Sequence, residues 1–83
     1  MKTNELKKGV RVKLRNGWEA DIADNAKGNT RMAKVYGFET EIGSVYSHDI
    51  VLAQSPIDGK SWVKVEHTPA QIKLKASLAA VGF

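Results

Sequence analysis

The stretch VRVKLRNGWEADI, residues 10–22, alternates apolar and polar residues on both sides of an Asn-Gly pair. Such alternation is typical of strands with one buried face, and Asn-Gly is a strong hairpin signal. A two-residue loop would set Glu19 opposite Leu14, among apolar side chains. A three-residue loop, 15–17, with a left-handed glycine pairs apolar residues with apolar ones and basic residues with acidic ones. We therefore predict this second register, which pairs Arg11 with Asp21, Val12 with Ala20, Lys13 with Glu19 and Leu14 with Trp18.

The alternation continues after the bend DNAKGN and predicts further strands. TRMAKVYGFETEI contains two, separated by a tight turn at Gly37 or joined as one strand with a bulge there. The apolar spacing breaks at Gly43, as at a bulge, and YSHD predicts one helical turn before the strand IVLA. WVKVE follows the turn SPIDGKS as the last strand. Trp18 and Phe38 fall on apolar positions and are predicted to lie in the core.

The period changes at the end of the chain, in HTPAQIKLKASLAAVGF. Thr68 suits the N-cap of a helix, Pro69 its first position and Gln71 its third, which together make a capping box. The pattern predicts that the helix packs on the strands through Leu74, Leu78 and Ile72, and that it leaves Gln71, Lys73 and Lys75 in water.

Short strands, tight hairpins and a one-turn helix before a late strand predict a small closed or nearly closed β-barrel. We predict a single mainly-β domain over residues 1–83, with about five strands in 9–66 and the helix in 68–81. LKKGVRVKL resembles the entry strand of KOW-type and related SH3-like barrels. GNTRMAKVYGFETEIGSVYSHDI resembles small uncharacterised proteins of tailed bacteriophages, over residues 9–67. The resemblance implies a phage origin and brings no known active site.

Composition narrows the kind of partner. The chain has 13 Lys and Arg against 9 Asp and Glu, a net charge of +4, and residues 1–15 hold six of the basic groups and one Glu. This surplus fits an anionic partner. There is no Cys, which excludes disulfides and thiolate metal sites, and no apolar run of signal-peptide or membrane-span length. We expect a cytoplasmic protein, in the host cytoplasm if a phage encodes it, without contact to a membrane.

The loop NAKGNTRMAKV, residues 25–35, combines basic side chains with residues that leave the backbone accessible. Its Asn and Gly residues let backbone amides approach an anion, and Lys27, Arg31 and Lys34 supply positive charge. Arg15 has no carboxylate opposite it in the predicted register, and it would join them if the two loops meet at one end of the fold. We predict a phosphate-binding surface, with an ordinary solvated loop as the alternative.

Exposed aromatic rings beside basic groups would suit single-stranded nucleic acid, because bases stack on them. Tyr36 and Trp62 are the candidates for this role, with core or rim packing as the alternative. Arg11 and Lys13 are left out because their predicted cross-strand neighbours are acidic. The predicted nucleic-acid-binding residues are Arg15, Lys27, Arg31, Lys34 and Tyr36.

No residue pattern indicates catalysis or metal binding. His48 and His67 lack metal-ligand spacing, and Ser47-His48-Asp49 are consecutive, so their side chains diverge rather than form a triad. No glycine pattern matches a nucleotide-binding loop. Glu39 and Glu41 are spaced as on the solvated face of a strand. We expect no catalytic residue, no metal and no cofactor.

These features predict a small non-enzymatic binding protein, phage-encoded by its resemblance, that binds nucleic acid through a basic loop end. The alternative is a protein-interaction module that binds and inhibits or redirects a host enzyme of transcription or defence. A more distant alternative is an oligomer that sequesters a small anionic metabolite. All three functions are open at this point.

Overall fold

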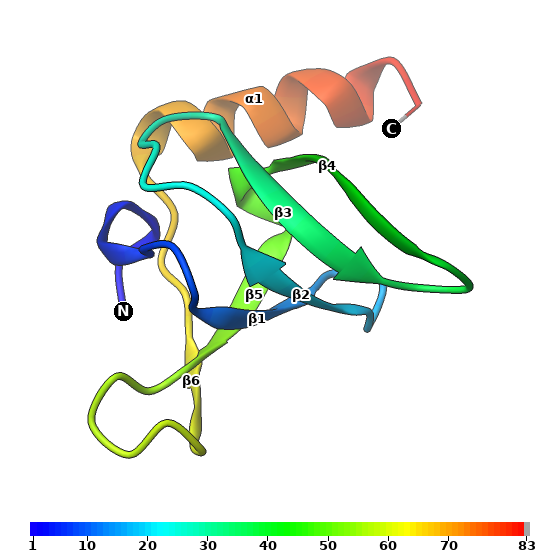
Figure 1. The fold of residues 1–83 in the computed structure, drawn as a ribbon. Helices are drawn as coiled ribbons and strands as arrows, with labels where there is room; N and C mark the ends of the chain where they lie inside the picture. Colours follow the sequence, from blue (N-terminus) through cyan, green and yellow to red (C-terminus); the bar gives the residue numbers. More distant parts are fainter. Residues whose placement is uncertain (83) are drawn as a thin grey trace.

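The computed structural model describes residues 1–82 of the 83-residue chain. Six antiparallel strands form one sheet in the order β4-β3-β2-β1-β5-β6, and a C-terminal helix lies beside it (Figure 1). The elements are η1 (Thr3–Glu5), β1 (Arg11–Leu14), β2 (Glu19–Ile22), β3 (Thr30–Tyr36), β4 (Thr40–Tyr46), η2 (Ser47–Asp49), β5 (Ile50–Gln54), β6 (Trp62–Lys64) and α1 (Pro69–Ala80). The predicted mainly-β fold with a C-terminal helix is confirmed. The sheet has six strands and is open, since no ladder in residues 1–82 joins β4 to β6.

The register predicted for the hairpin of β1 and β2 is confirmed. Arg11 lies opposite Asp21, Val12 opposite Ala20 and Lys13 opposite Glu19. The loop has three residues, and its glycine, Gly17, has a φ of 91°. The Leu14 N–H donates to the Trp18 carbonyl at 2.7 Å. Because side chains alternate between the faces of a strand, this register buries the apolar residues and places the charged ones on the outer face.

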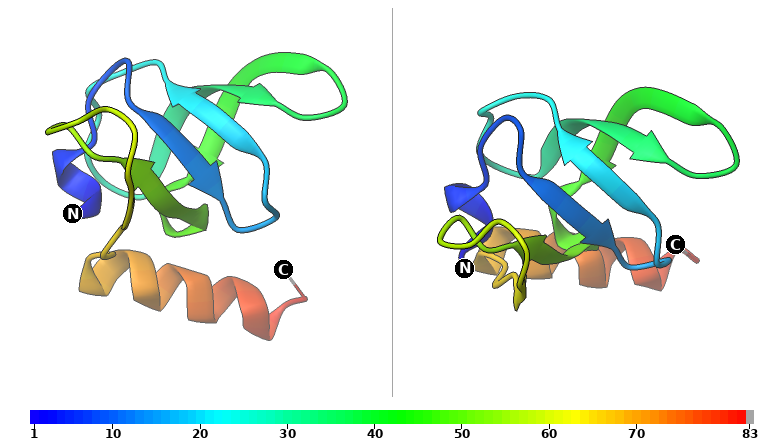
Figure 2. Two further views of the ribbon diagram at one scale, coloured as in Figure 1. Left: turned by 90° about the horizontal axis from the view of Figure 1, so that it is seen from below. Right: turned by 60° about the horizontal axis from the view of Figure 1, so that its bottom comes forward.

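β3 and β4 form a long hairpin whose far end extends away from the rest of the sheet (Figures 1 and 2). We call residues 35–42 the hairpin arm. Pairing runs without a register shift from Thr30–Tyr46 to Tyr36–Thr40, so the bulge predicted at Gly43 is wrong and Gly37 opens a turn. The single helical turn predicted in YSHD is confirmed as η2.

The predicted burial of Trp18 and Phe38 is wrong. Their exposed fractions are 39% and 97%, and the two rings meet edge to face at the hairpin arm with centroids 5.7 Å apart. Both residues alternate with polar ones, as the side chains of a hairpin do. The arm, however, reaches past the rest of the sheet, so these side chains lie outside the core.

The core occupies the inner face of the sheet and is small. It consists of Leu6, Val12, Leu14, Ala20, Ile22, Ala33, Ile50, Ala53 and Val65. All of them come from the strands and the segments next to them, and none comes from α1. The sheet therefore buries its apolar face largely without help from the helix.

Helix α1 begins as predicted. The Thr68 hydroxyl accepts from the Gln71 N–H at 3.2 Å, and the Gln71 side-chain oxygen accepts from the Thr68 N–H at 3.0 Å, which completes the capping box. Gln71, predicted to lie in water, is fully buried instead. Its amide nitrogen donates to the Gly28 carbonyl at 2.7 Å. The amide is buried because it links the first turn of the helix to the loop between β2 and β3.

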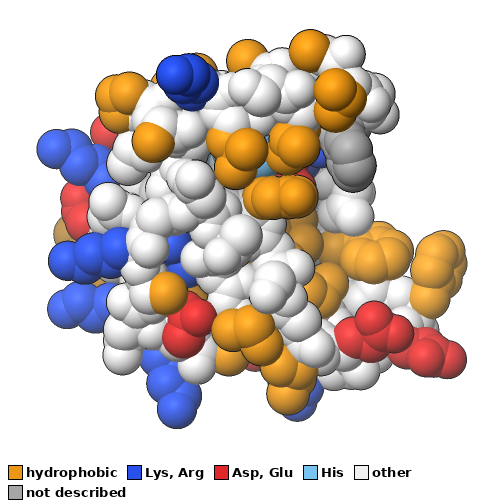
Figure 3. Space-filling view, turned by 90° about the horizontal axis from the view of Figure 1, so that it is seen from above, with side chains coloured by type: hydrophobic (Ala, Val, Ile, Leu, Met, Phe, Trp, Pro, Cys, Tyr) orange, Lys and Arg blue, Asp and Glu red, His pale blue; other side chains and the backbone are white. Residues whose placement is uncertain are grey.

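The rest of α1 is more exposed than its apolar residues suggest. Leu74 and Leu78 are half-buried, as their predicted packing requires, but Ile72 is exposed and the predicted contact through it is wrong. The helix packs mainly against η2. Apolar side chains remain visible along its outer side (Figure 3).

Candidate nucleic-acid interface

Arg31, a predicted phosphate ligand, points into the protein. It lies on β3 in phase with the buried Ala33, and only 1% of its surface is exposed. Its guanidinium donates to the carbonyls of Gly28 and Thr30 at 3.1 Å, to that of Thr3 at 3.3 Å, and to Asn4 Oδ1 at 3.2 Å. Burial lowers its pKa, which the charge of Asp24 partly opposes. The predicted phosphate contact is wrong, because this side chain cannot reach a ligand while the protein is folded.

The carbonyl of Gly28 anchors the inner side of the loop between β2 and β3 to the rest of the protein. It accepts hydrogen bonds from Arg31 Nη1 at 3.1 Å, from Ser47 Oγ at 2.7 Å and from Gln71 Nε2 at 2.7 Å. These donors come from β3, η2 and α1. The loop is therefore held in place by three elements, and only its outward side chains are available to a ligand.

Arg15 is also engaged within the protein. Its Nη2 lies 3.2 Å from Asp49 Oδ1, and its backbone N–H donates to the Asp49 carbonyl at 2.7 Å. No carboxylate lies opposite Arg15 in the hairpin register, as predicted, but η2 brings Asp49 to the hairpin tip. Residues 15–17 lie at one end of the hairpin of β1 and β2, and residues 23–29 lie at its other end (Figure 1). Arg15 therefore does not lie beside Lys27.

Lys34 and Tyr36 lie on the outer face of β3, in a cluster with residues of β1 and β2. The Tyr36 hydroxyl donates to Asp21 Oδ2 at 2.7 Å. The Arg11 guanidinium carbon lies 4.7 Å from the Tyr36 ring centroid, and Lys34 Nζ lies 5.8 Å from it. Arg11 also pairs with Glu19 at 3.2 Å and with Asp21. A base could stack on this ring only by displacing the protein's own cations.

The pKa directions in this cluster follow from the same contacts. The hydrogen bond from Arg11 lowers the pKa of Asp21, although burial opposes it, and the bond with Asp21 raises the pKa of Tyr36. The pKa of Arg11 is raised, mainly by its bond to Asp21. Each group thus favours the charge state that holds the others in place.

Trp62 is covered in a similar way on the neighbouring strands. It is half-buried, and Lys13 Nζ lies 4.9 Å from its ring centroid. Lys13 faces Glu19 in register, as predicted, but its ammonium also lies over this ring. The outer face of the sheet therefore pairs its aromatic and basic residues with each other.

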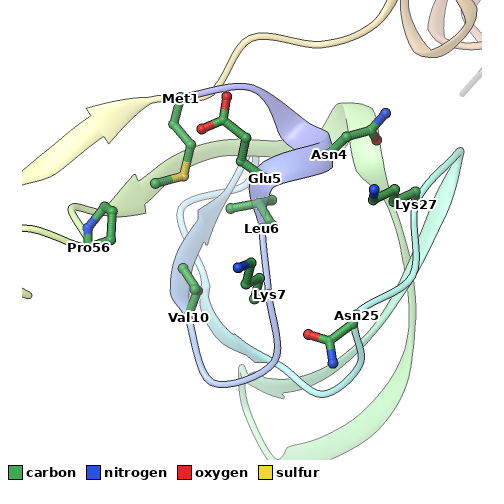
Figure 4. Close-up of a pocket in the computed structure, with 9 residues that line it drawn as sticks. All are labelled: Met1, Asn4, Glu5, Leu6, Lys7, Val10, Asn25, Lys27 and Pro56. Atoms are coloured by element: carbon green, nitrogen blue, oxygen red, sulfur yellow. The ribbon is translucent and has the colours of Figure 1, made fainter.

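Lys27, another predicted site residue, borders a cavity. A hollow of about 730 Å³ lies between the N-terminal segment, the start of β1 and the loop after β2 (Figure 4). Its apolar lining is Met1, Leu6, Val10 and Pro56, and its polar lining is Asn4, Glu5, Lys7, Asn25 and Lys27. The Lys8 N–H donates to Asn25 Oδ1 at 2.9 Å, which ties the N-terminal segment to the loop. We call this cavity the basic hollow.

The charge of the basic hollow comes from exposed lysines. Within residues 1–82, no carboxylate lies within 4.0 Å of the ammonium groups of Lys7 and Lys27. Glu5 is the one acidic residue of the lining, and its side chain accepts from the Lys2 N–H at 3.4 Å. An apolar lining with two available ammonium groups can hold an anionic ligand that has an apolar part.

Sequence reasoning missed Lys7 and the apolar lining of this hollow. Lys7 belongs to the basic run in residues 1–15, which on its own indicates only a charge excess. Leu6, directly before the Lys7-Lys8 pair, is a signal that the run lies against the core, and it is 2% exposed. Met1 and Pro56 are far apart in the chain, and no local pattern joins them.

The histidines have structural surroundings. His67 Nε2 lies 2.8 Å from the Ile50 carbonyl oxygen. Ser47 donates to Gly28, and His48 Nε2 is 3.7 Å from Asp49 Oδ1, so no triad geometry is present in Ser47-His48-Asp49. Within residues 1–82, no group of three or more His, Asp or Glu side chains is placed to hold a metal ion.

His48 should make stability depend on pH. It is 3% exposed and stacks on Tyr46 with ring centroids 5.0 Å apart. Burial lowers its pKa, with the neighbouring Asp49 opposing the shift and Arg15, His67 and Lys75 adding to it. A folded-state pKa below the unfolded value of about 6.5 gives stability that is present above that value and lost as the pH falls through the folded pKa.

We therefore expect the free energy of unfolding to decrease between about pH 7 and pH 5, with a slope of at most about 1.4 kcal/mol per pH unit. Urea denaturation at several pH values measures it. The variant His48→Phe keeps an aromatic ring against Tyr46 and should flatten this part of the profile. An unchanged slope in His48→Phe would show that another group is responsible.

Comparison of the chain with protein-family models, with curated proteins and with solved structures finds no match. No helix in residues 1–82 is both long enough and apolar enough to cross a membrane.

Proposed function

We propose that this is a small non-enzymatic protein that binds nucleic acid at the basic hollow, in the cytoplasm of a host cell and encoded by a phage. The observation that carries the proposal is the placement of Lys7 and Lys27 beside an apolar lining, without an ion pair to either in residues 1–82. Lys27 is among the nucleic-acid-binding residues predicted from the sequence. The proposed site keeps this residue of the predicted basic loop end and adds Lys7.

The chemistry of the hollow favours single strands over duplexes. Its apolar side chains suit the face of an unpaired base, whereas a paired base would be enclosed in its own helix. Its volume of about 730 Å³ lies within the usual range for small-ligand sites of about 300–1,000 Å³. The lysines act as point charges for the flanking phosphates and read no sequence.

The test is the salt dependence of binding to labelled single-stranded DNA and RNA of mixed sequence. Log affinity should fall with log salt with a slope of about −0.7 for each phosphate neutralised. The double variant Lys7→Glu with Lys27→Glu should weaken binding to all sequences by more than about tenfold. Lys34→Glu, the same charge change on the outer face of β3, should weaken it far less.

Two results would contradict the proposal. One is the absence of binding to both nucleic acids at low salt, and the other is wild-type affinity in the variant with Lys7 and Lys27 reversed. Competition by free mononucleotides distinguishes a polymer ligand from a small anionic metabolite, since a metabolite site would be saturated by the mononucleotide alone.

A protein target is the second candidate function, in which the chain binds and inhibits or redirects a host enzyme of transcription or defence. The exposure of Phe38 and of the Trp18 ring that it meets, 97% and 39%, favours it, because exposed apolar side chains that lie together are typical of interaction surfaces. It takes first place if the nucleic-acid test fails.

A further inference from the structure

Strand β4 forms one edge of the sheet, and within residues 1–82 its one neighbouring strand is β3. The Met32 carbonyl accepts from the N–H of Ala23, directly after β2, and the Ser47 N–H donates to the Asn29 carbonyl, both at 2.8 Å. Backbone groups alternate in direction along a strand, so Met32 turns its own toward β2, and the residues next to it in β3 turn theirs toward β4. In the register of the two strands, the N–H and C=O groups that turn away from β3 are those of Thr40, Ile42, Ser44 and Tyr46.

These outward backbone groups lie on an accessible edge. The side chains of Thr40, Ile42, Ser44 and Tyr46 are exposed. Within residues 1–82, no other part of the protein makes a hydrogen bond to the main chain of Ile42 or Ser44. The half of β4 that belongs to the hairpin arm also lies apart from helix α1 (Figures 1 and 2).

The opposite edge of the sheet is protected, whereas β4 is not. β6 is three residues long, and the N-terminal segment lies along its end: the Met1 ammonium donates to the Lys64 carbonyl at 3.1 Å, and the Glu66 N–H donates to the Met1 carbonyl at 2.7 Å. β4 has seven residues, TEIGSVY, with no Lys, no Pro and no register shift against β3. A long edge without such protection is a template for another strand.

The sequence of β4 is compatible with a second copy of itself. An antiparallel pair centred on Gly43 sets Ile42 opposite Ser44, Glu41 opposite Val45 and Thr40 opposite Tyr46. Glu41 is the one charged residue of β4, and in this register its two copies lie about 13 Å apart along the strands. A centre at Ile42 would bring the two carboxylates to about 7 Å on one face. A centre at Ser44 would pair fewer residues, because Ser47 already belongs to η2.

Pairing around Gly43 also covers an exposed apolar side chain. Ile42 is 70% exposed on the outer face of the sheet, and across the two-fold axis it would lie diagonally beside its own copy, within reach of contact. The two Gly43 residues face each other at a position without mutual hydrogen bonds, where strands approach to about 4.5 Å between Cα atoms. The absence of a side chain at Gly43 leaves this closest approach free.

We propose that two copies of this chain form a two-fold dimer by antiparallel pairing of their β4 strands, centred on Gly43. The main chains of Ile42 and Ser44 exchange hydrogen bonds with those of Ser44 and Ile42 in the other copy, which joins the two sheets into one. Because each copy has a single open edge at β4, the assembly closes at two copies. This inference is independent of the proposed binding at the basic hollow.

Disulfide cross-linking tests the register, because the chain has no Cys of its own. A Cβ added at Gly43 meets nothing within 4 Å, so Gly43→Cys should fold normally. In the dimer its two thiols face each other at a Cα separation of about 4.5 Å, which permits a disulfide. In Thr40→Cys, the control on the same strand, the thiols would lie about 20 Å apart. With oxidised glutathione as the oxidant, Gly43→Cys should form the linked dimer more than about tenfold faster than Thr40→Cys.

Analytical ultracentrifugation of the wild type from about 1 μM to about 1 mM should show a reversible monomer–dimer equilibrium. Ile42→Lys sets two ammonium groups diagonally across the axis and should raise the dissociation constant more than about tenfold. Ile57→Lys, the same change at a 95% exposed residue of the loop between β5 and β6, is the matched control and should leave the dimer unchanged. Circular dichroism verifies that each variant is folded.

Four results would overturn the proposal. The first is a wild type that stays monomeric, which would leave the β4 edge to a strand of another protein. The second is growth past a dimer, and the third is dimerisation of Ile42→Lys like the wild type. The last is cross-linking of Thr40→Cys as fast as that of Gly43→Cys, which would indicate random collision.

Discussion

Replacing Arg31 by Glu should leave most of the protein unfolded in water. The change removes four hydrogen bonds from the guanidinium and places a carboxylate against the carbonyl oxygens of Gly28, Thr30 and Thr3. A buried group that loses its charged hydrogen bonds and faces like partial charges costs several kcal/mol. We expect a loss above about 5 kcal/mol, which is as large as the whole stability of many small domains. Urea denaturation followed by circular dichroism measures it.

Two variants separate the charge of Arg31 from its position. Arg31→Met keeps an unbranched apolar stem and should cost less, about 2 to 4 kcal/mol, because the carbonyls of Thr3 and Thr30 lose their charged donor without gaining a repulsive group. Lys27→Glu, on the same loop but exposed, should change stability by less than about 0.5 kcal/mol. If Arg31→Glu unfolds at the wild-type urea concentration, the side chain is not part of the interior.

Replacing Gln71 by Glu should detach the start of α1 at neutral pH. The Gln71 oxygen accepts from the Thr68 N–H, and a carboxylate can still do so. The Gln71 nitrogen donates to the Gly28 carbonyl at 2.7 Å, and a carboxylate there would meet an oxygen without a proton between them. We expect a loss of about 2 to 4 kcal/mol at pH 7, from the lost bond and the buried charge.

This loss should diminish as the pH falls. In the Gln71→Glu variant, protonation of the introduced carboxyl restores a donor to the Gly28 carbonyl, so the folded protein binds the proton more tightly than the unfolded one. Folding therefore raises the pKa of that carboxyl. The recovered stability is fully present below the unfolded pKa of about 4.3 and is lost as the pH rises through the folded pKa.

The control for this pH dependence is Gln71→Ala, which removes both hydrogen bonds of the amide and introduces no titrating group. It should show no recovery at low pH. Urea denaturation of both variants between about pH 3 and pH 7 measures the difference, across the range in which a glutamate titrates. Equal pH profiles for Gln71→Glu and Gln71→Ala would contradict the contact with Gly28.

The register of the first hairpin could be predicted because the competing registers differ in local chemistry. One register mixes Glu19 with Leu14, and the other matches Arg11 with Asp21 and buries Val12 against Ala20. The capping box of Thr68 and Gln71 is equally local, since its two partners are three residues apart. Such features depend on neighbours within one hairpin or one helical turn.

The alternation along β3 predicts that Arg31 is buried, whereas its charge predicts that it is exposed. It shares a phase with Ala33 and Val35, which predicts the inner face, while basic residues are seldom buried. Its carbonyl partners are Gly28 in the loop before β3, Thr30 at the start of β3 and Thr3 in η1, and only the assembled fold brings Thr3 to it. The exposure of Phe38 escapes prediction for a related reason, because nothing local shows that the arm extends past the rest of the sheet.

The hydrogen bonds around Gly28 bear on the order in which the chain folds. Gln71 is 43 residues from Gly28, and the bond from Arg31 to Thr3 spans 28 residues, whereas the hairpins close over short loops. Closing long loops is entropically costly, so we expect the hairpins to form first and the helix to dock last. Contacts made after the rate-limiting step mainly slow unfolding. The docked helix would then act on the lifetime of the native state and hardly on the speed with which it forms.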